Sequence, residues 1–169
     1  KGLLIFNPEN NKERHISKDD GFLPNNRVNT IYIDSRNSIW IGTWGGVCHK
    51  VGDTWNAISK KDGLIVDNVN VICEDNLGGM WFGSYAVKGG GLSHFYNNKW
   101  ETYTVKDGLP NENITAILKD HNNTMWVGAG MYEQGGAVAY DYKKDWKITK
   151  TLSMDSGLAG EKVRSIYED

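Results

Sequence analysis

The stretch Ile39-Trp-Ile-Gly-Thr43 returns twice in this 169-residue chain, as Met80-Trp-Phe-Gly-Ser84 and as Met125-Trp-Val-Gly-Ala129. An apolar segment ending in aspartate precedes each copy, and a fourth such segment follows the third copy. These segments are Val28–Asp34, Val69–Asp75, Ile114–Asp120 and Val163–Asp169, which begin 41, 45 and 49 residues apart. A period of this length is the signature of a repeat architecture.

Each repeat contains four short apolar blocks. After the tryptophan-containing block come a Gly-Gly-apolar step and a block that opens on a second tryptophan. Clusters of Gly, Asn and Asp separate the blocks, which is typical of strands joined by tight turns. Four strands in about 40–45 residues match the length of one blade of a β-propeller. We therefore predict an all-β fold, a β-propeller with four-stranded antiparallel blades.

The repeats also predict the blade boundaries. Residues 1–19 are expected to be strands three and four of a preceding blade, and residues 155–169 the first strand of a following one, at Val163–Glu168. Three full blades are expected at 20–61, 62–106 and 107–154. Because a propeller needs at least four blades, the propeller is expected to be incomplete as given. The predicted partners are the remaining blades of a longer propeller or a second copy of the chain.

Composition excludes several functions. The net charge is −2 and no Lys/Arg run occurs, which argues against nucleic-acid binding. No run of 18 apolar residues is present, so we expect no membrane contact by this segment. Cys48 and Cys73 fall on predicted strands and are interpreted as buried free thiols.

Three strings carry a family resemblance: DGFLPNNRVNTIYID (20–34), SIWIGTWGGV (38–47) and DGLPNENITAILKD (107–120). They resemble two-component regulator propeller repeats, and the resemblance covers residues 20–169. It implies part of the sensor domain of a bacterial hybrid two-component protein, located in the periplasm or outside the cell. It also implies a carbohydrate-derived ligand as the cue and a membrane-spanning kinase downstream.

In a four-stranded meander the connections alternate between two faces. The equal-length turns Asp34–Ser38, Asp75–Gly79 and Asp120–Thr124 are expected on one face, called here the turn face. The connections between strands two and three, and those between blades, are expected on the opposite loop face. Their lengths differ among repeats, and variable loops on a rigid scaffold tend to carry binding residues.

The predicted ligand site lies on this loop face. Three aromatic side chains with polar neighbours would suit a sugar or peptide, by stacking and hydrogen bonding. The alternative is that these aromatics pack onto their own loops. The nine candidates are Asn26, Arg27, Trp44, Asn68, Tyr85, Lys88, Asn113, Tyr132 and Glu133. The other six tryptophans form two repeated columns that are expected in the core: Trp40, Trp81 and Trp126, and Trp55, Trp100 and Trp146.

No catalytic residue, metal ligand or cofactor is expected. His49 and His94 occupy a strand position that Ala139 fills in the third repeat, which indicates packing. The recurrent aspartates that end the first apolar block are interpreted as structural. Two alternatives to a sensor stay open: a protein-interaction or adhesion scaffold, and a polysaccharide-active enzyme, for which Glu112 and Glu133 are the candidate carboxylate pair.

Overall fold

The computed structural model of the protein describes residues 2–85, 88–130 and 134–169. Within these ranges the chain forms fourteen strands in four antiparallel sheets, one of two strands and three of four. Three short 3-10 turns, Val105–Asp107, Tyr142–Lys144 and Met154–Ser156, are the only helical elements of the described part. The all-β prediction is confirmed.

Each four-stranded sheet is a meander in which consecutive strands pair. We call β3–β6 blade 1, β7–β10 blade 2 and β11–β14 blade 3. The strands are β1 (Leu3–Asn7), β2 (Lys12–Ile16), β3 (Val28–Ile33), β4 (Ile39–Thr43), β5 (Gly46–Val51), β6 (Thr54–Ile58), β7 (Val69–Glu74), β8 (Met80–Ser84), β9 (Leu92–Tyr96), β10 (Lys99–Tyr103), β11 (Ile114–Lys119), β12 (Thr124–Ala129), β13 (Gly136–Asp141) and β14 (Lys147–Leu152).

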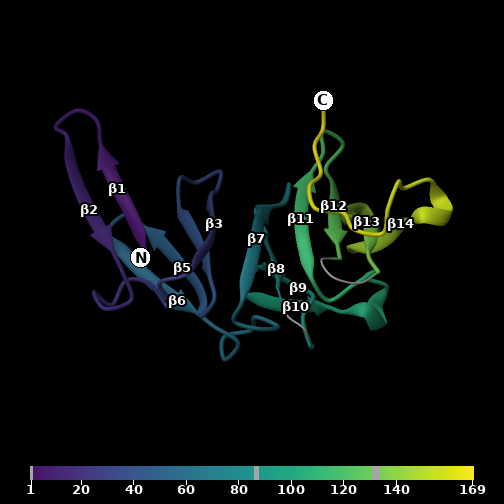
Figure 1. Ribbon diagram of the computed structural model, residues 1–169, viewed down its shortest axis with the longest axis horizontal. Coiled ribbons are helices and arrows are strands. Elements are labelled where there is room, and N and C mark those ends of the chain that lie inside the picture. Colours follow the sequence, from purple (N-terminus) through teal and green to yellow (C-terminus); the bar gives the residue numbers. More distant parts are fainter. Residues whose placement is uncertain (1, 86–87, 131–133) are drawn as a thin grey trace.

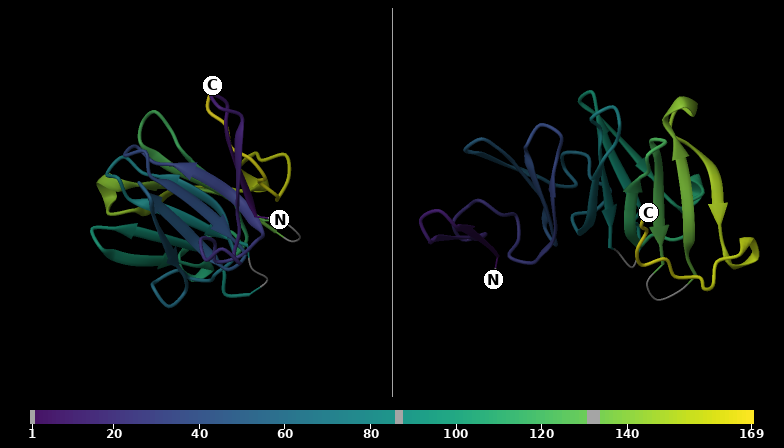
Figure 2. Two further views of the ribbon diagram at one scale, coloured as in Figure 1. Left: turned by 90° about the vertical axis from the view of Figure 1, so that its left-hand side faces the viewer. Right: turned by 90° about the horizontal axis from the view of Figure 1, so that it is seen from above.

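The sheets follow one another along an arc, from the β1–β2 hairpin to blade 3 (Figures 1 and 2). The hydrophobic core lies between neighbouring sheets. Trp40 of blade 1 shares a cluster with Ile72 and Phe82 of blade 2, and Trp81 of blade 2 shares another with Ile114 of blade 3. This face-to-face burial of successive meanders is the architecture of a β-propeller.

A side-chain hydrogen bond at one repeated position joins neighbouring blades. The donor is the second residue of the first strand in each blade (β3, β7 or β11). The acceptor is the backbone carbonyl of the residue that begins the first apolar segment of the next repeat. All three bonds are partly buried, where a missing partner would cost stability. The pairs are Asn29 Nδ2 to Val69 (2.9 Å), Asn70 Nδ2 to Ile114 (3.1 Å) and Thr115 Oγ1 to Val163.

Residues 158–169 pair with no strand in the described structure, so the strand at Val163–Glu168 stays a prediction. The segment nevertheless lies beside blade 3. Thr115 holds the Val163 carbonyl, and the backbone N–H of His121 donates to the Glu168 carboxylate. Without a second strand to complete a backbone ladder, these contacts position the segment but do not make it a strand.

Trp146 is buried in the core as predicted, but its predicted place in the tryptophan column is wrong. Phe95 pairs with Trp100 in blade 2, whereas the corresponding Tyr140 of blade 3 pairs with Ile148. A register shift between Ala139 and Tyr140, together with the 3-10 turn at Tyr142–Lys144, moves Trp146 out of the column. Ile148 takes the third place.

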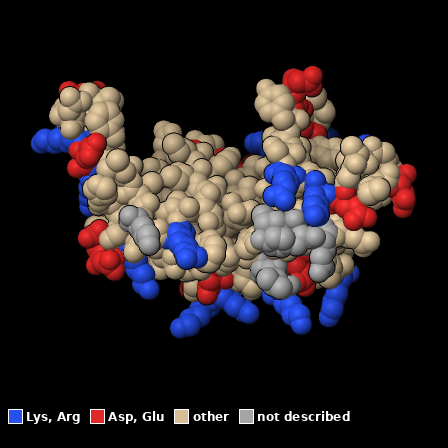
Figure 3. Space-filling view, viewed as in Figure 1, with Lys and Arg blue, Asp and Glu red and all other residues tan. Residues whose placement is uncertain are grey.

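One face of β3 is uncovered. Ile31 and Ile33 are 50% and 61% exposed, whereas the equivalent Ile72 and Glu74 of β7 are buried against blade 1. In the view of Figure 3 the middle of the molecule carries few Lys, Arg, Asp or Glu side chains. Exposed isoleucine side chains on a sheet face are suited to packing against another protein surface.

Candidate functional site

A repeated aspartate–tryptophan hydrogen bond organises the turn face. In each blade the indole Nε1 donates to the carboxylate six residues earlier, while the other carboxylate oxygen accepts backbone N–H groups of the turn. The structural interpretation of this aspartate column is therefore confirmed. The distances are 2.9 Å for Trp40–Asp34, 3.0 Å for Trp81–Asp75 and 2.9 Å for Trp126–Asp120.

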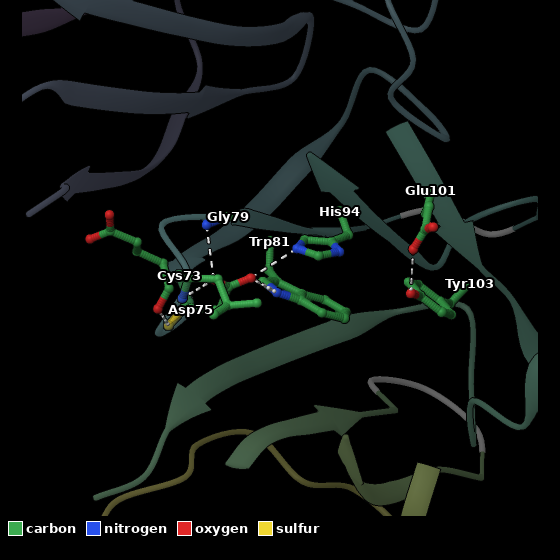
Figure 4. A network of polar contacts seen from close by, with 9 residues as sticks. Cys73, Asp75, Gly79, Trp81, His94, Glu101 and Tyr103 are labelled. Atoms are coloured by element: carbon green, nitrogen blue, oxygen red, sulfur yellow. Dashed lines mark hydrogen bonds and ion pairs between the residues drawn. The ribbon is translucent and has the colours of Figure 1, made fainter. Parts of the chain in front are cut away.

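Asp75 has an additional partner, shown in Figure 4. The Nε2 atom of His94 lies 2.8 Å from Asp75 Oδ2, and the imidazole stacks on Trp81 with ring centroids 4.2 Å apart. Burial alone would raise the pKa of Asp75, but hydrogen bonds from His94, from the backbone N–H groups of Gly79 and Leu77, and from Trp81 hold it below its ordinary value of 3.8.

His49 also stacks on a tryptophan, Trp40, with ring centroids 3.6 Å apart. The interpretation of this histidine position as packing is thus confirmed for His49 and His94. Among the residues that the structure describes, no three His, Cys, Asp or Glu side chains are grouped to hold a metal ion.

Trp44 is the centre of the loop face. Its side chain is 45% exposed, although the indole is held at two points. Nε1 donates to Asn29 Oδ1 at 3.0 Å, and the Arg27 guanidinium carbon lies 4.2 Å from the ring centroid. A cation over one face and a hydrogen bond at the edge fix the ring in place while much of it contacts solvent.

The contacts continue from Trp44 to blade 2. Asn29 Nδ2 donates to Asn68 Oδ1 at 3.1 Å, and the Tyr85 backbone N–H donates to the Asn68 carbonyl at 3.0 Å. We call Arg27, Asn29, Trp44, Asn68 and Tyr85 the Trp44 platform. It spans the junction between blades 1 and 2, and four of its members were predicted from the sequence.

The other predicted residues lie outside the platform's contacts. Asn26 Oδ1 accepts from the Lys18 backbone, and the Asn113 carbonyl accepts from Gly130 beside blade 3. Lys88 is exposed. Tyr132 and Glu133 fall outside the described residues.

Asn29 is the platform residue that the sequence reasoning missed. Asn29 lies in a predicted strand, whereas all nine candidate residues lie in predicted loops. Its polar side chain in an otherwise apolar block, matched by Asn70 and Thr115 in the other repeats, was the available signal.

Glu112 accepts a hydrogen bond from the Gly89 backbone N–H at 2.9 Å. The contact ties the blade 2 loop to the connection that leads into blade 3. Its predicted catalytic partner, Glu133, lies outside the described residues, so the structure describes no carboxylate pair at this place.

Together the meanders and the buried inter-blade clusters define a segment of a β-propeller, and its loop face carries an exposed aromatic side chain, Trp44. The sequence model of the two-component regulator propeller family matches residues 23–45, 63–86 and 108–130. The chain therefore carries three copies of this family's repeat. No curated protein matched the chain.

Two solved structures from B. thetaiotaomicron are similar. One is the extracellular domain of BT3049, described as a hybrid two-component system protein, with 27% identity and a TM-score of 0.74 over 91% of this chain and 21% of that one. The other is the extracellular domain of BT4673, described as a one-component system protein, with 18% identity and a TM-score of 0.75 over 99% and 22%. The chain thus spans about a fifth of their length. No helix in the described residues is long and apolar enough to cross a membrane.

Proposed function

We propose that the chain is a ligand-binding module in the extracytoplasmic sensor of a bacterial two-component signalling protein, and that its ligand is carbohydrate-derived. The family match and the similarity to the extracellular domain of BT3049 support a sensor. The proposed binding place is the Trp44 platform.

The exposed, immobilised indole of Trp44 carries the proposal. The exposed part of the indole offers a large aromatic surface on which a ligand ring can stack. Its orientation is already fixed by Asn29 and Arg27, so a ligand ring would not have to order it. Guanidinium and carboxamide groups around an aromatic face are suited to sugar hydroxyls.

The location of the platform suggests how binding would be transmitted. Arg27 and Trp44 belong to blade 1 and its entry loop, whereas Asn68 and Tyr85 flank β7 and β8 of blade 2. A ligand that contacts both sides would favour one arrangement of the two blades and so bias a signalling equilibrium. Further blades or a second copy of the chain would cover Ile31 and Ile33 on β3.

Calorimetric titration of the full protein with a panel of neutral oligosaccharides tests the proposal. We expect at least one to bind, and Trp44→Ala to weaken it about 30-fold, the usual effect of truncating a tryptophan that dominates an interface. Phe6→Ala is the matched control, because Phe6 is an aromatic residue that is 52% exposed on β1, away from the Trp44 platform. Absence of binding, or equal binding by the Trp44 variant, would contradict the proposal.

The alternative is a protein-interaction scaffold, in which a second copy of the chain covers the exposed β3 face. In that case Ile31→Lys would abolish association with a protein partner and leave saccharide binding unchanged. The mass in solution, from light scattering coupled to size exclusion, would report a second copy of the chain as that partner.

A further inference from the structure

A pocket of about 300 Å³ lies between blades 2 and 3 on the turn face. Its volume is at the lower end of the range of small-molecule sites in proteins. None of the nine residues predicted from the sequence lines it. We call it the blade 2–3 pocket. Blade 2 contributes Tyr96, Lys99 and Glu101 to its lining, and blade 3 contributes Tyr142, Asp145 and Trp146.

The blade 2 wall of this pocket follows from the pairing of β9 with β10. Tyr96 lies opposite Lys99, and His94 lies opposite Glu101. Because these two pairs are two residues apart along each strand, all four side chains share one face of the sheet. Blade 1 has no charged residue at the positions of Lys99 and Glu101, so these charges are not needed to build a blade. The blade 1 residues at the positions of Tyr96, Lys99 and Glu101 are Val51, Thr54 and Asn56.

The blade 3 wall is the turn between β13 and β14. Asp145 and Trp146 both have left-handed backbone angles there, with φ of 57° and 54°. The Trp146 backbone N–H donates to the Asp141 carbonyl at 3.1 Å, which closes the turn. The buried indole packs its edge on His94 with ring centroids 5.2 Å apart, and the Tyr142 ring lies 6.2 Å from it. The aromatic floor of the pocket is therefore in place before a ligand binds.

Three exposed charges surround this aromatic floor. They belong to Lys99, Glu101 and Asp145. The two ion pairs of the described residues each involve a histidine, so none of these three charges is paired. Glu101 is positioned by Tyr103, whose hydroxyl donates to its Oε2 atom at 2.9 Å (Figure 4). The pocket thus presents one cation and two carboxylates that no other side chain of the described structure neutralises.

A ligand that carries both an ammonium and a carboxylate group would complement both signs of charge through charge-assisted hydrogen bonds. An aromatic ring on the same ligand would pack against the tyrosine rings. We propose that the blade 2–3 pocket binds an α-amino acid with an aromatic side chain. Its ammonium group lies beside Glu101 and Asp145, its carboxylate beside Lys99, and its ring against Tyr96 and Tyr142. The site is separate from the Trp44 platform and does not depend on it.

Calorimetric titration of the full protein with phenylalanine, phenethylamine and 3-phenylpropionate tests the proposal. The three probes share one ring, and the second and third each lack one of the two charged groups. We expect phenylalanine to bind about tenfold more tightly than either analogue, as expected for a hydrogen bond between charged groups. Lys99→Met should weaken phenylalanine roughly tenfold without weakening phenethylamine, whereas Glu101→Gln should weaken both roughly tenfold.

The controls are exposed charges on β2, away from the pocket. Lys12→Met and Glu13→Gln make the same changes of charge there and should leave phenylalanine binding unchanged. Trp44→Ala should also leave it unchanged, which separates this site from the proposed saccharide site. A dissociation constant above about 10 mM for phenylalanine, binding of phenethylamine as tight as that of phenylalanine, or unchanged binding by the Lys99 and Glu101 variants would overturn the proposal.

Discussion

Replacing Asp75 by alanine removes one acceptor that four donors of blade 2 share. Two of these donors belong to the backbone of the turn, and two are buried side chains that have no other acceptor among the described contacts. The donors are Leu77 N (2.8 Å), Gly79 N (2.8 Å), Trp81 Nε1 (3.0 Å) and His94 Nε2 (2.8 Å).

The expected cost follows from burial. Trp81 and His94 are 0% and 2% exposed, so water cannot replace the lost carboxylate. Each buried donor left without an acceptor costs about 1–3 kcal/mol, which gives about 2–6 kcal/mol for Asp75→Ala. Asp34→Ala leaves only one buried side-chain donor, Trp40, without an acceptor and should cost about 1–3 kcal/mol. The difference between the two variants measures the contribution of His94.

Equilibrium urea unfolding, followed by tryptophan fluorescence and by circular dichroism, provides both free energies of unfolding. A double-mutant cycle of Asp75→Ala with His94→Ala should give a coupling energy of about 1–3 kcal/mol. The reasoning is refuted if the Asp75 and Asp34 variants are equally destabilised within about 0.5 kcal/mol and the coupling is zero.

Three further predictions concern acid, packing and thiol reactivity. The pKa of Asp75 is lower in the folded protein, so the stability it contributes is present above pH 3.8 and lost as the pH falls through the lower folded value; Asp75→Asn should remove this part of the acid sensitivity in pH-dependent unfolding. Gly83→Ala would place a methyl group 2.6 Å from Ile114 Cγ2 and should lower the unfolding free energy by about 1–3 kcal/mol, whereas Gly160→Ala, with open space around it, should be neutral. Burial raises the pKa of Cys48 to about 11, so a thiol reagent at pH 8 should label it only after unfolding, and rapid labelling of the native protein would contradict this assignment.

The blades could be predicted because the chemistry of the turns repeats with the strands. Asp34, Asp75 and Asp120 each precede a tryptophan by six residues, and that constant spacing reflects a real hydrogen bond. The third member of the second tryptophan column could not be predicted in this way. A register shift beside Tyr140 and an added 3-10 turn move Trp146, and neither leaves a periodic signal in the sequence.

Some residues of the candidate site could also be predicted from the sequence, and others could not. Trp44 and Arg27 could be predicted because they lie in loop-face connections, whose lengths differ among the repeats. The different partners of His49 and His94 could not be predicted. The two histidines occupy the same strand position, but only His94 Nε2 pairs with the aspartate of its blade. The Trp146 ring that packs on His94 comes from blade 3, and a single repeat carries no information about its neighbour.

The hydrogen bond between the first strands of consecutive repeats affects how repeats can be added during evolution. Donor and acceptor recur at the same two positions of every unit, at Asn29 with Val69 and at Asn70 with Ile114. A duplicated unit of 41 to 49 residues would therefore contain the side-chain donor that bonds to the next unit and the backbone acceptor that bonds to the previous one. Gene duplication could lengthen the array without a compensating substitution in either neighbour, while selection acts separately on the loops between the units.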